Sequence, residues 1–123
     1  KKIDLNLANE FNLKKVSEFT GNDHGVIKDL LYLMIESFRE DFHSLKSYTS
    51  PLKPNLIKSL AHKIKPNFDL IGLDSLFKIS NILENKSLSN EEYYQLTKTI
   101  YGSKTTIIKM LSESIEKLNF QTL

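Results

Sequence analysis

His62 is the residue of this chain whose type and setting are best suited to chemistry. Leu60 and Ile64 repeat at helical spacing, and at about 100° per residue His62 falls on the opposite side of that helix. Lys58 and Lys65 share the outward face with His62. An exposed imidazole is largely neutral and nucleophilic at neutral pH, and two ammonium groups favour an anion beside it. We therefore expect a site that accepts a negatively charged group and later releases it.

A short motif surrounds His62 and continues into the helix expected next along the chain: Ala61-His62-x-Ile64-Lys65, then Gly72, Leu76 and Leu83-Glu84. This motif resembles the core of histidine-containing phosphotransfer (HPt) domains, which are helical bundles that carry phosphoryl groups between receiver-domain aspartates. The resemblance extends from about Phe11 to the C-terminus. It implies that a receiver phosphoaspartate phosphorylates His62, and that His62 passes the group to another receiver.

The resemblance also implies roles for the surrounding groups. Lys65 would be the cation that stabilises the phosphoryl group, and Lys58 is a candidate auxiliary cation because it lies on the same face. Response-regulator receiver domains would be the partners. The Mg²⁺ and the acidic pocket would belong to those receivers, so we expect no cofactor or metal in this domain. The domain would carry the group without kinase activity, either on its own or as the C-terminal module of a membrane sensor kinase.

Pro66 departs from the HPt pattern, because the family usually has glycine after the motif lysine. Proline has no backbone N–H and its ring crowds the preceding turn, so we expect a kink or a break in the helix beside His62. Proline also disfavours helical geometry at Lys65, the residue before it. Our hypothesis is that the kink leaves the space through which a partner approaches the imidazole.

Composition limits the other functions. The 123 residues, 40% of them apolar, predict one domain with a modest core. There is no cysteine, which excludes disulfides and thiolate metal sites and favours a cytoplasmic location. A net charge of +2 with Arg39 as the only arginine disfavours a nucleic-acid binder. The longest apolar run, residues 30–35, is too short for a membrane span. We expect a monomer without membrane contact.

The spacing of apolar residues predicts an all-α fold, an up-down four-helix bundle with an additional short N-terminal helix. Residues 1–10 show no clear period and are expected to be irregular. Asn22 or Asp23 is expected to cap the first long helix, and Ser89 with Glu92 to form a capping box. The expected helices cover residues 13–19, residues 24–48, the segment from Pro54 to a stop at Gly72, residues 74–83, and residues 91–119 with Gly102 inside.

Three other functions compete with the phosphorelay. In the first, the motif is degenerate and the bundle binds a receiver or a partner helix without phosphotransfer. In the second, the His62 helix, the break at Pro66 and the following helix form a helix-turn-helix that binds nucleic acid with a steep salt dependence. A small-molecule enzyme is the least supported, because no Ser/His/Asp motif or glycine-rich phosphate loop is present. His24 and His43 lack metal-ligand spacing to each other and to His62.

Overall fold

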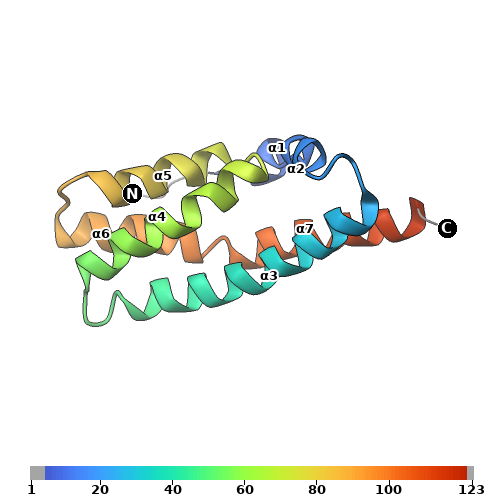
Figure 1. Ribbon diagram of the computed structural model, residues 1–123. Coiled ribbons are helices and arrows are strands. Elements are labelled where there is room, and N and C mark those ends of the chain that lie inside the picture. The colour runs from blue at the N-terminus through green and yellow to red at the C-terminus, as the bar shows by residue number, and fades with distance from the viewer. Residues whose placement is uncertain (1–4, 122–123) are drawn as a thin grey trace.

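The computed structural model describes residues 5–121, and every regular element in that range is a helix apart from a lone bridge between Thr49 and Leu52 (Figure 1). The predicted all-α class is therefore confirmed. None of the helices in this range combines the length and the apolar character needed to cross a membrane. The helices are α1 (Leu7–Glu10), α2 (Lys14–Phe19), α3 (His24–Ser47), α4 (Pro54–Leu70), α5 (Asp74–Asn85), α6 (Asn90–Tyr101) and α7 (Lys104–Gln121).

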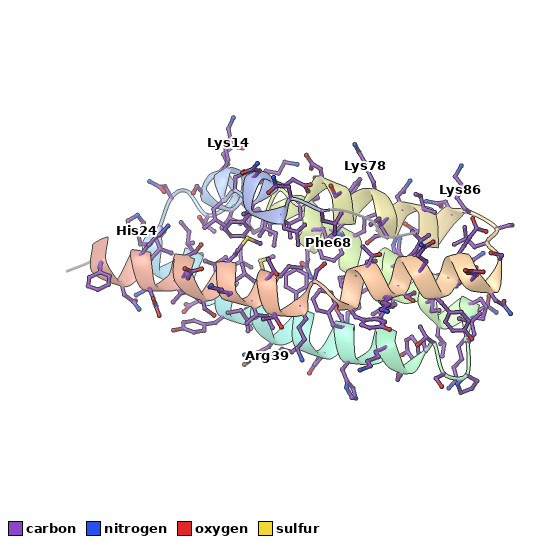
Figure 2. All side chains as sticks on the ribbon, turned by 180° about the vertical axis from the view of Figure 1, so that it is seen from behind. Lys14, His24, Arg39, Phe68, Lys78 and Lys86 are labelled. Carbon is purple, nitrogen blue, oxygen red and sulfur yellow. The ribbon has the colours of Figure 1, made fainter. Side chains whose placement is uncertain are left out.

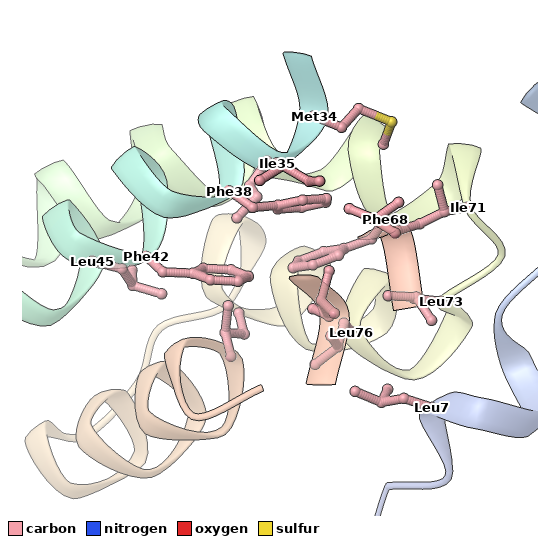
Figure 3. Packing of buried hydrophobic residues seen from close by; sticks show 14 of the residues in the cluster. Leu7, Met34, Ile35, Phe38, Phe42, Leu45, Phe68, Ile71, Leu73 and Leu76 are labelled. Carbon is pink, nitrogen blue, oxygen red and sulfur yellow. The ribbon is translucent and has the colours of Figure 1, made fainter. Parts of the chain in front are cut away.

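The long helices lie side by side with their apolar faces inward. Helix α4 packs along α5, and α3 packs along α7 while also contacting α4 and α6 (Figure 1). The centre of the core is a stack of three rings, in which Phe38 lies 5.4 Å from Phe42 and 5.5 Å from Phe68 between ring centroids (Figure 3). Because Phe68 belongs to the last turn of α4, this stack anchors the helix that carries His62.

Local sequence signals set three helix starts as predicted. The Asp23 side chain accepts a hydrogen bond from the Val26 backbone N–H and caps α3. Ser89 and Glu92 form the expected capping box at the start of α6. Pro54 occupies the first turn of α4, where a missing N–H costs nothing.

The expected continuous helix over residues 91–119 is wrong, because the chain is interrupted between α6 and α7. The Gly102 N–H still donates to the Lys98 carbonyl, but the Ser103 N–H donates to Ile100, which tightens the turn. A Cβ at Gly102 would lie 2.7 Å from the Lys98 carbonyl oxygen, so this turn requires glycine. A new helix therefore begins at Lys104.

The expectation that residues 1–10 are irregular is also wrong in part. Leu7–Glu10 forms a helical turn, because the Leu7 side chain is buried in the core and the turn contacts α7. Residues 1–4, which this expectation also covers, lie outside the described residues.

The N-terminal segment also fixes the turn between α4 and α5. Gly72 has a φ of +78°, and a Cβ there would lie 2.3 Å from the Asn12 amide nitrogen. The Glu10 carboxylate accepts hydrogen bonds from both the backbone N–H, at 2.9 Å, and the hydroxyl of Ser75 in the first turn of α5. These contacts hold in place the helix pair from which the site is built.

Candidate functional site

The imidazole of His62 projects from the middle of α4 into solvent, and its side chain is 75% exposed. Leu60 and Ile64, by contrast, are buried in the core. The ring therefore lies on the outward face of α4, as the helical periodicity predicted. Its buried neighbours pack into the core beneath it.

Glu84 of α5 is the group that orients this imidazole. One of its carboxylate oxygens contacts His62 Nδ1, and the other accepts a hydrogen bond of 2.5 Å from Lys65 Nζ. The Glu84 side chain is only 19% exposed, so the two contacts are partly shielded from water. One carboxylate of α5 thus contacts two residues of α4.

The charge of Glu84 determines which imidazole nitrogen carries the proton. The hydrogen bond from Lys65, followed by that from His62, holds the pKa of the Glu84 carboxyl below its ordinary value. An ionised carboxylate only accepts hydrogen bonds, so Nδ1 of the neutral ring must be the donor. Nε2 then carries the lone pair, on the far side of the ring from Glu84. This arrangement offers an exposed, oriented nucleophile.

Lys65 is directed toward α5 rather than into open solvent. Its side chain is 20% exposed, and its ammonium also donates to the Asn81 side-chain oxygen at 3.2 Å and lies 5.7 Å from the centroid of the Phe77 ring. In this arrangement the positive charge of Lys65 is shared with Glu84. Lys65 can contact a group bound at Nε2 only by leaving or sharing that carboxylate.

Lys58, the other predicted cation, lies one turn before His62 on α4 and is partly exposed. It takes part in none of the ion pairs within residues 5–121. Its ammonium is therefore available to an incoming anion without breaking a contact.

Sequence reasoning assigned no role to Glu84, Asn81 or Phe77. These residues are spaced four and three apart, which places them on one face of α5. Buried Ile79 and Leu83 mark another face of the same helix. Glu84 and Asn81 beside that apolar face were the available signal, but α5 had to be docked against the helix of His62 before this signal had meaning.

Of the kink or break expected at Pro66, the break is absent, because α4 continues through the proline to Leu70. A kink there, and the space that it would leave for a partner, stay predictions. The His62 carbonyl receives no hydrogen bond from position 66, since proline has no N–H to donate. Burial of Ile64 and Phe68 on both sides of Pro66 holds the helix together across this gap. The Pro66 side chain is itself exposed and does not belong to the core.

The remaining charged neighbours belong to other contacts. Lys63 pairs with Asp41 of α3 at 3.0 Å, and Asp69 pairs with Lys15 of α2 at 2.7 Å. No cluster of three histidine, cysteine or acidic side chains suited to a metal ion occurs within residues 5–121. The chemistry of the site therefore falls to His62, Glu84 and the two lysines.

Comparison with protein-family models, curated proteins and solved structures found no match to this chain. The geometry of the site and the motif around His62 are therefore the features that indicate a function.

Proposed function

We propose that this chain is a phosphorelay intermediate of two-component signal transduction, in which His62 carries the phosphoryl group. The observation that supports this most directly is the contact between His62 Nδ1 and the Glu84 carboxylate, on a ring that is otherwise exposed. A receiver domain delivers the group from its phosphoaspartate, and a second receiver takes it away. The module supplies no kinase activity, and the Mg²⁺ belongs to the receivers.

The transfer requires one bond to form and one to break. The Nε2 lone pair of His62 attacks phosphorus, the bond from phosphorus to the aspartate oxygen breaks, and the aspartate leaves as a carboxylate with the electron pair. Nδ1 keeps its proton, so the phosphorylated ring is positively charged and faces the Glu84 carboxylate. In the second transfer, a receiver aspartate attacks phosphorus and Nε2 recovers its lone pair.

The two lysines have different parts in this proposal. Lys58 is the cation available to the incoming phosphoryl group, because it forms no ion pair within residues 5–121. Lys65 keeps Glu84 ionised and approaches the phosphoryl group when it shares that carboxylate. Each exposed contact to phosphate is worth about 0.2–1 kcal/mol, which favours docking without trapping the group.

We also propose a specific arrangement of the helices. Helices α3, α4, α5 and the α6–α7 pair form an up-down four-helix bundle, with α1 and α2 as the additional N-terminal part. The module acts in the cytoplasm as a monomer, and the exposed face of α4 that carries His62 meets the receiver.

Phosphorylation by phosphoramidate, a small donor whose P–N bond breaks with loss of ammonia, tests the site without a cognate partner. We expect intact-protein mass spectrometry to show one phosphoryl group on the wild-type chain, stable to alkali and labile to acid. His62→Gln should remove it completely. His24→Gln and His43→Gln are matched controls and should keep it.

Transfer between receivers is tested separately, with purified receiver domains phosphorylated by acetyl phosphate. Movement of the label to wild type and on to a second receiver, but not to His62→Gln, supports the relay. Absence of label from both phosphoramidate and receivers overturns it. Binding of receivers without label would then favour an interaction module that does not transfer phosphate.

A further inference from the structure

A second group of cationic side chains lies between α3 and α7, and it includes neither His62 nor the residues that contact it. A hollow of about 400 Å³ is lined there by Arg39 of α3 and by four residues of α7: Lys104, Thr105, Ile108 and Lys109. Figure 2 shows Arg39 on α3 near the point where α6 passes into α7. The hollow lies next to the interruption at Gly102, because Lys104, one of its lining residues, is the first residue of α7.

The three cations of this hollow, Arg39, Lys104 and Lys109, form no ion pair among the described residues, and no acidic residue lines the hollow. Like charges gathered in one concavity repel one another and raise the local concentration of anions. An anion bound among them would relieve that repulsion.

The donor set indicates the chemistry of the anion. Arg39 is the only arginine of the chain, and its planar guanidinium donates two parallel hydrogen bonds to a phosphate or carboxylate. Lys104 and Lys109 add compact charges, and the Thr105 hydroxyl adds a neutral donor. Three positive charges match an anion with two or more negative charges. The hollow has room for a small ligand and not only for a single ion.

We propose that this hollow binds a small, multiply charged phosphate anion, such as pyrophosphate or a phosphate ester. Arg39 clamps two oxygens of one phosphoryl group, and Lys104 and Lys109 neutralise the remaining charge. The half-buried Ile108 side chain provides the apolar wall against which an ester group would lie. This binding is independent of phosphoryl transfer at His62, since the hollow and His62 share no residue.

Titration of the isotopically labelled protein with pyrophosphate, followed by backbone amide chemical shifts at constant ionic strength, tests the site. We expect saturable shifts that centre on Arg39 and the first turns of α7. Arg39→Gln should weaken binding at least about tenfold, because a charge-assisted contact is lost. The pyrophosphate affinity of Arg39→Lys should lie between those of wild type and Arg39→Gln. Lysine keeps the positive charge but cannot donate two parallel hydrogen bonds.

Matched variants separate this site from general attraction to a basic protein. Lys78→Gln and Lys86→Gln remove exposed charges on the α5 side and should leave the pyrophosphate affinity unchanged (Figure 2). His62→Gln should also leave it unchanged, so failure of the relay and failure of this site are separate results. Thermal unfolding of each variant checks that the fold is retained.

Three results would overturn the proposal. One is an equal loss of affinity in the control variants and in Arg39→Gln. Another is a set of shifts spread over lysines throughout the surface. The third is binding of citrate as tight as that of pyrophosphate at the same ionic strength, which would show a general polyanion surface in place of a phosphate site.

Discussion

Glu84 and Asp41 both face cationic residues of α4, but they do so from different neighbouring helices and in different surroundings. Glu84 of α5 is 19% exposed, and each of its oxygens has a partner. Asp41 of α3 is only 3% exposed; one oxygen accepts from Lys63, and the other has no hydrogen-bond partner among the described residues. The two contacts on α4 thus differ in burial and in how completely the carboxylate is satisfied.

This difference separates a contact suited to chemistry from one that concerns stability. Glu84 can respond when the imidazole gains positive charge, because its contacts lie at the edge of solvent. Asp41 is a desolvated charge that depends on Lys63 alone. Changes around Glu84 should therefore alter the reaction more than the fold, and changes around Asp41 should do the reverse.

Among changes at the two carboxylate contacts, Glu84→Gln should have the largest effect on the reaction. It keeps the shape of the side chain and removes the charge that orients His62 and stabilises the phosphorylated ring. We expect phosphorylation by phosphoramidate to slow by about tenfold to a hundredfold, the loss typical when the hydrogen-bond partner that orients a metal-binding histidine is removed. Glu113→Gln, an exposed change on α7, is the control. Equal rates in the two variants would contradict the role of Glu84.

Lys63→Met should have the largest effect on stability. It leaves the Asp41 carboxylate buried without a cation, which should lower the free energy of unfolding by about 1–3 kcal/mol. Denaturant unfolding measures this change, with Lys78→Met as the control. Phosphorylation of His62 should continue at nearly the wild-type rate under conditions where the variant is folded.

The double variant Asp41→Asn/Lys63→Met isolates the cause of that loss. Without the buried charge, the missing cation no longer matters, so most of the stability should return. A double variant as unstable as Lys63→Met would show that the lysine stem, and not the charge, supports the packing between α3 and α4.

The two contacts should also lose their contribution to stability at opposite ends of the pH range. The folded-state pKa of Glu84 lies below its ordinary value of 4.5, so its contribution is present above pH 4.5 and is lost as the pH falls below it. The hydrogen bond to Asp41 raises the pKa of Lys63 above 10.5 in the folded state. Its contribution is present below pH 10.5 and is lost as the pH rises further.

Unfolding free energies measured against pH test both directions. The difference between wild type and Glu84→Gln should shrink at acid pH, and the difference between wild type and Lys63→Met should shrink at alkaline pH. The same pH dependence in both variants would show that the two carboxylates do not act separately.

Lys58→Gln should have the smallest effect. Lys58 lies on the partly exposed side of α4, where a contact to phosphate contributes about 0.2–1 kcal/mol, so the phosphorylation rate should fall by less than about fivefold. The phosphorylation rate of Lys65→Gln should fall further than that of Lys58→Gln, because this change also removes a partner of Glu84. If Lys58→Gln proves the slower variant, Lys58 is the main cation for the phosphoryl group.

Much of the fold could be predicted from local patterns. The periodic apolar residues of α3 and α4, the Asp23 cap and the Ser89 capping box depend on residues within a few positions of one another. The break expected at Pro66 was wrong for the same reason, while the kink expected there stays a prediction. A local rule predicts a break there, but burial of Phe68 in the ring stack outweighs the missing hydrogen bond.

The sequence by itself determined that the chain is helical and that His62 stands on the polar side of its helix, because 3.6-residue periodicity sorts each helix into an inward and an outward face. Tertiary structure alone decided which partners those faces meet. Glu84 lies 22 residues beyond His62, and its contact with Nδ1 depends on how α4 docks against α5. The cationic hollow likewise exists only because the turn at Gly102 starts α7 beside Arg39. Such contacts depend on the register between helices, which no local pattern of residues specifies.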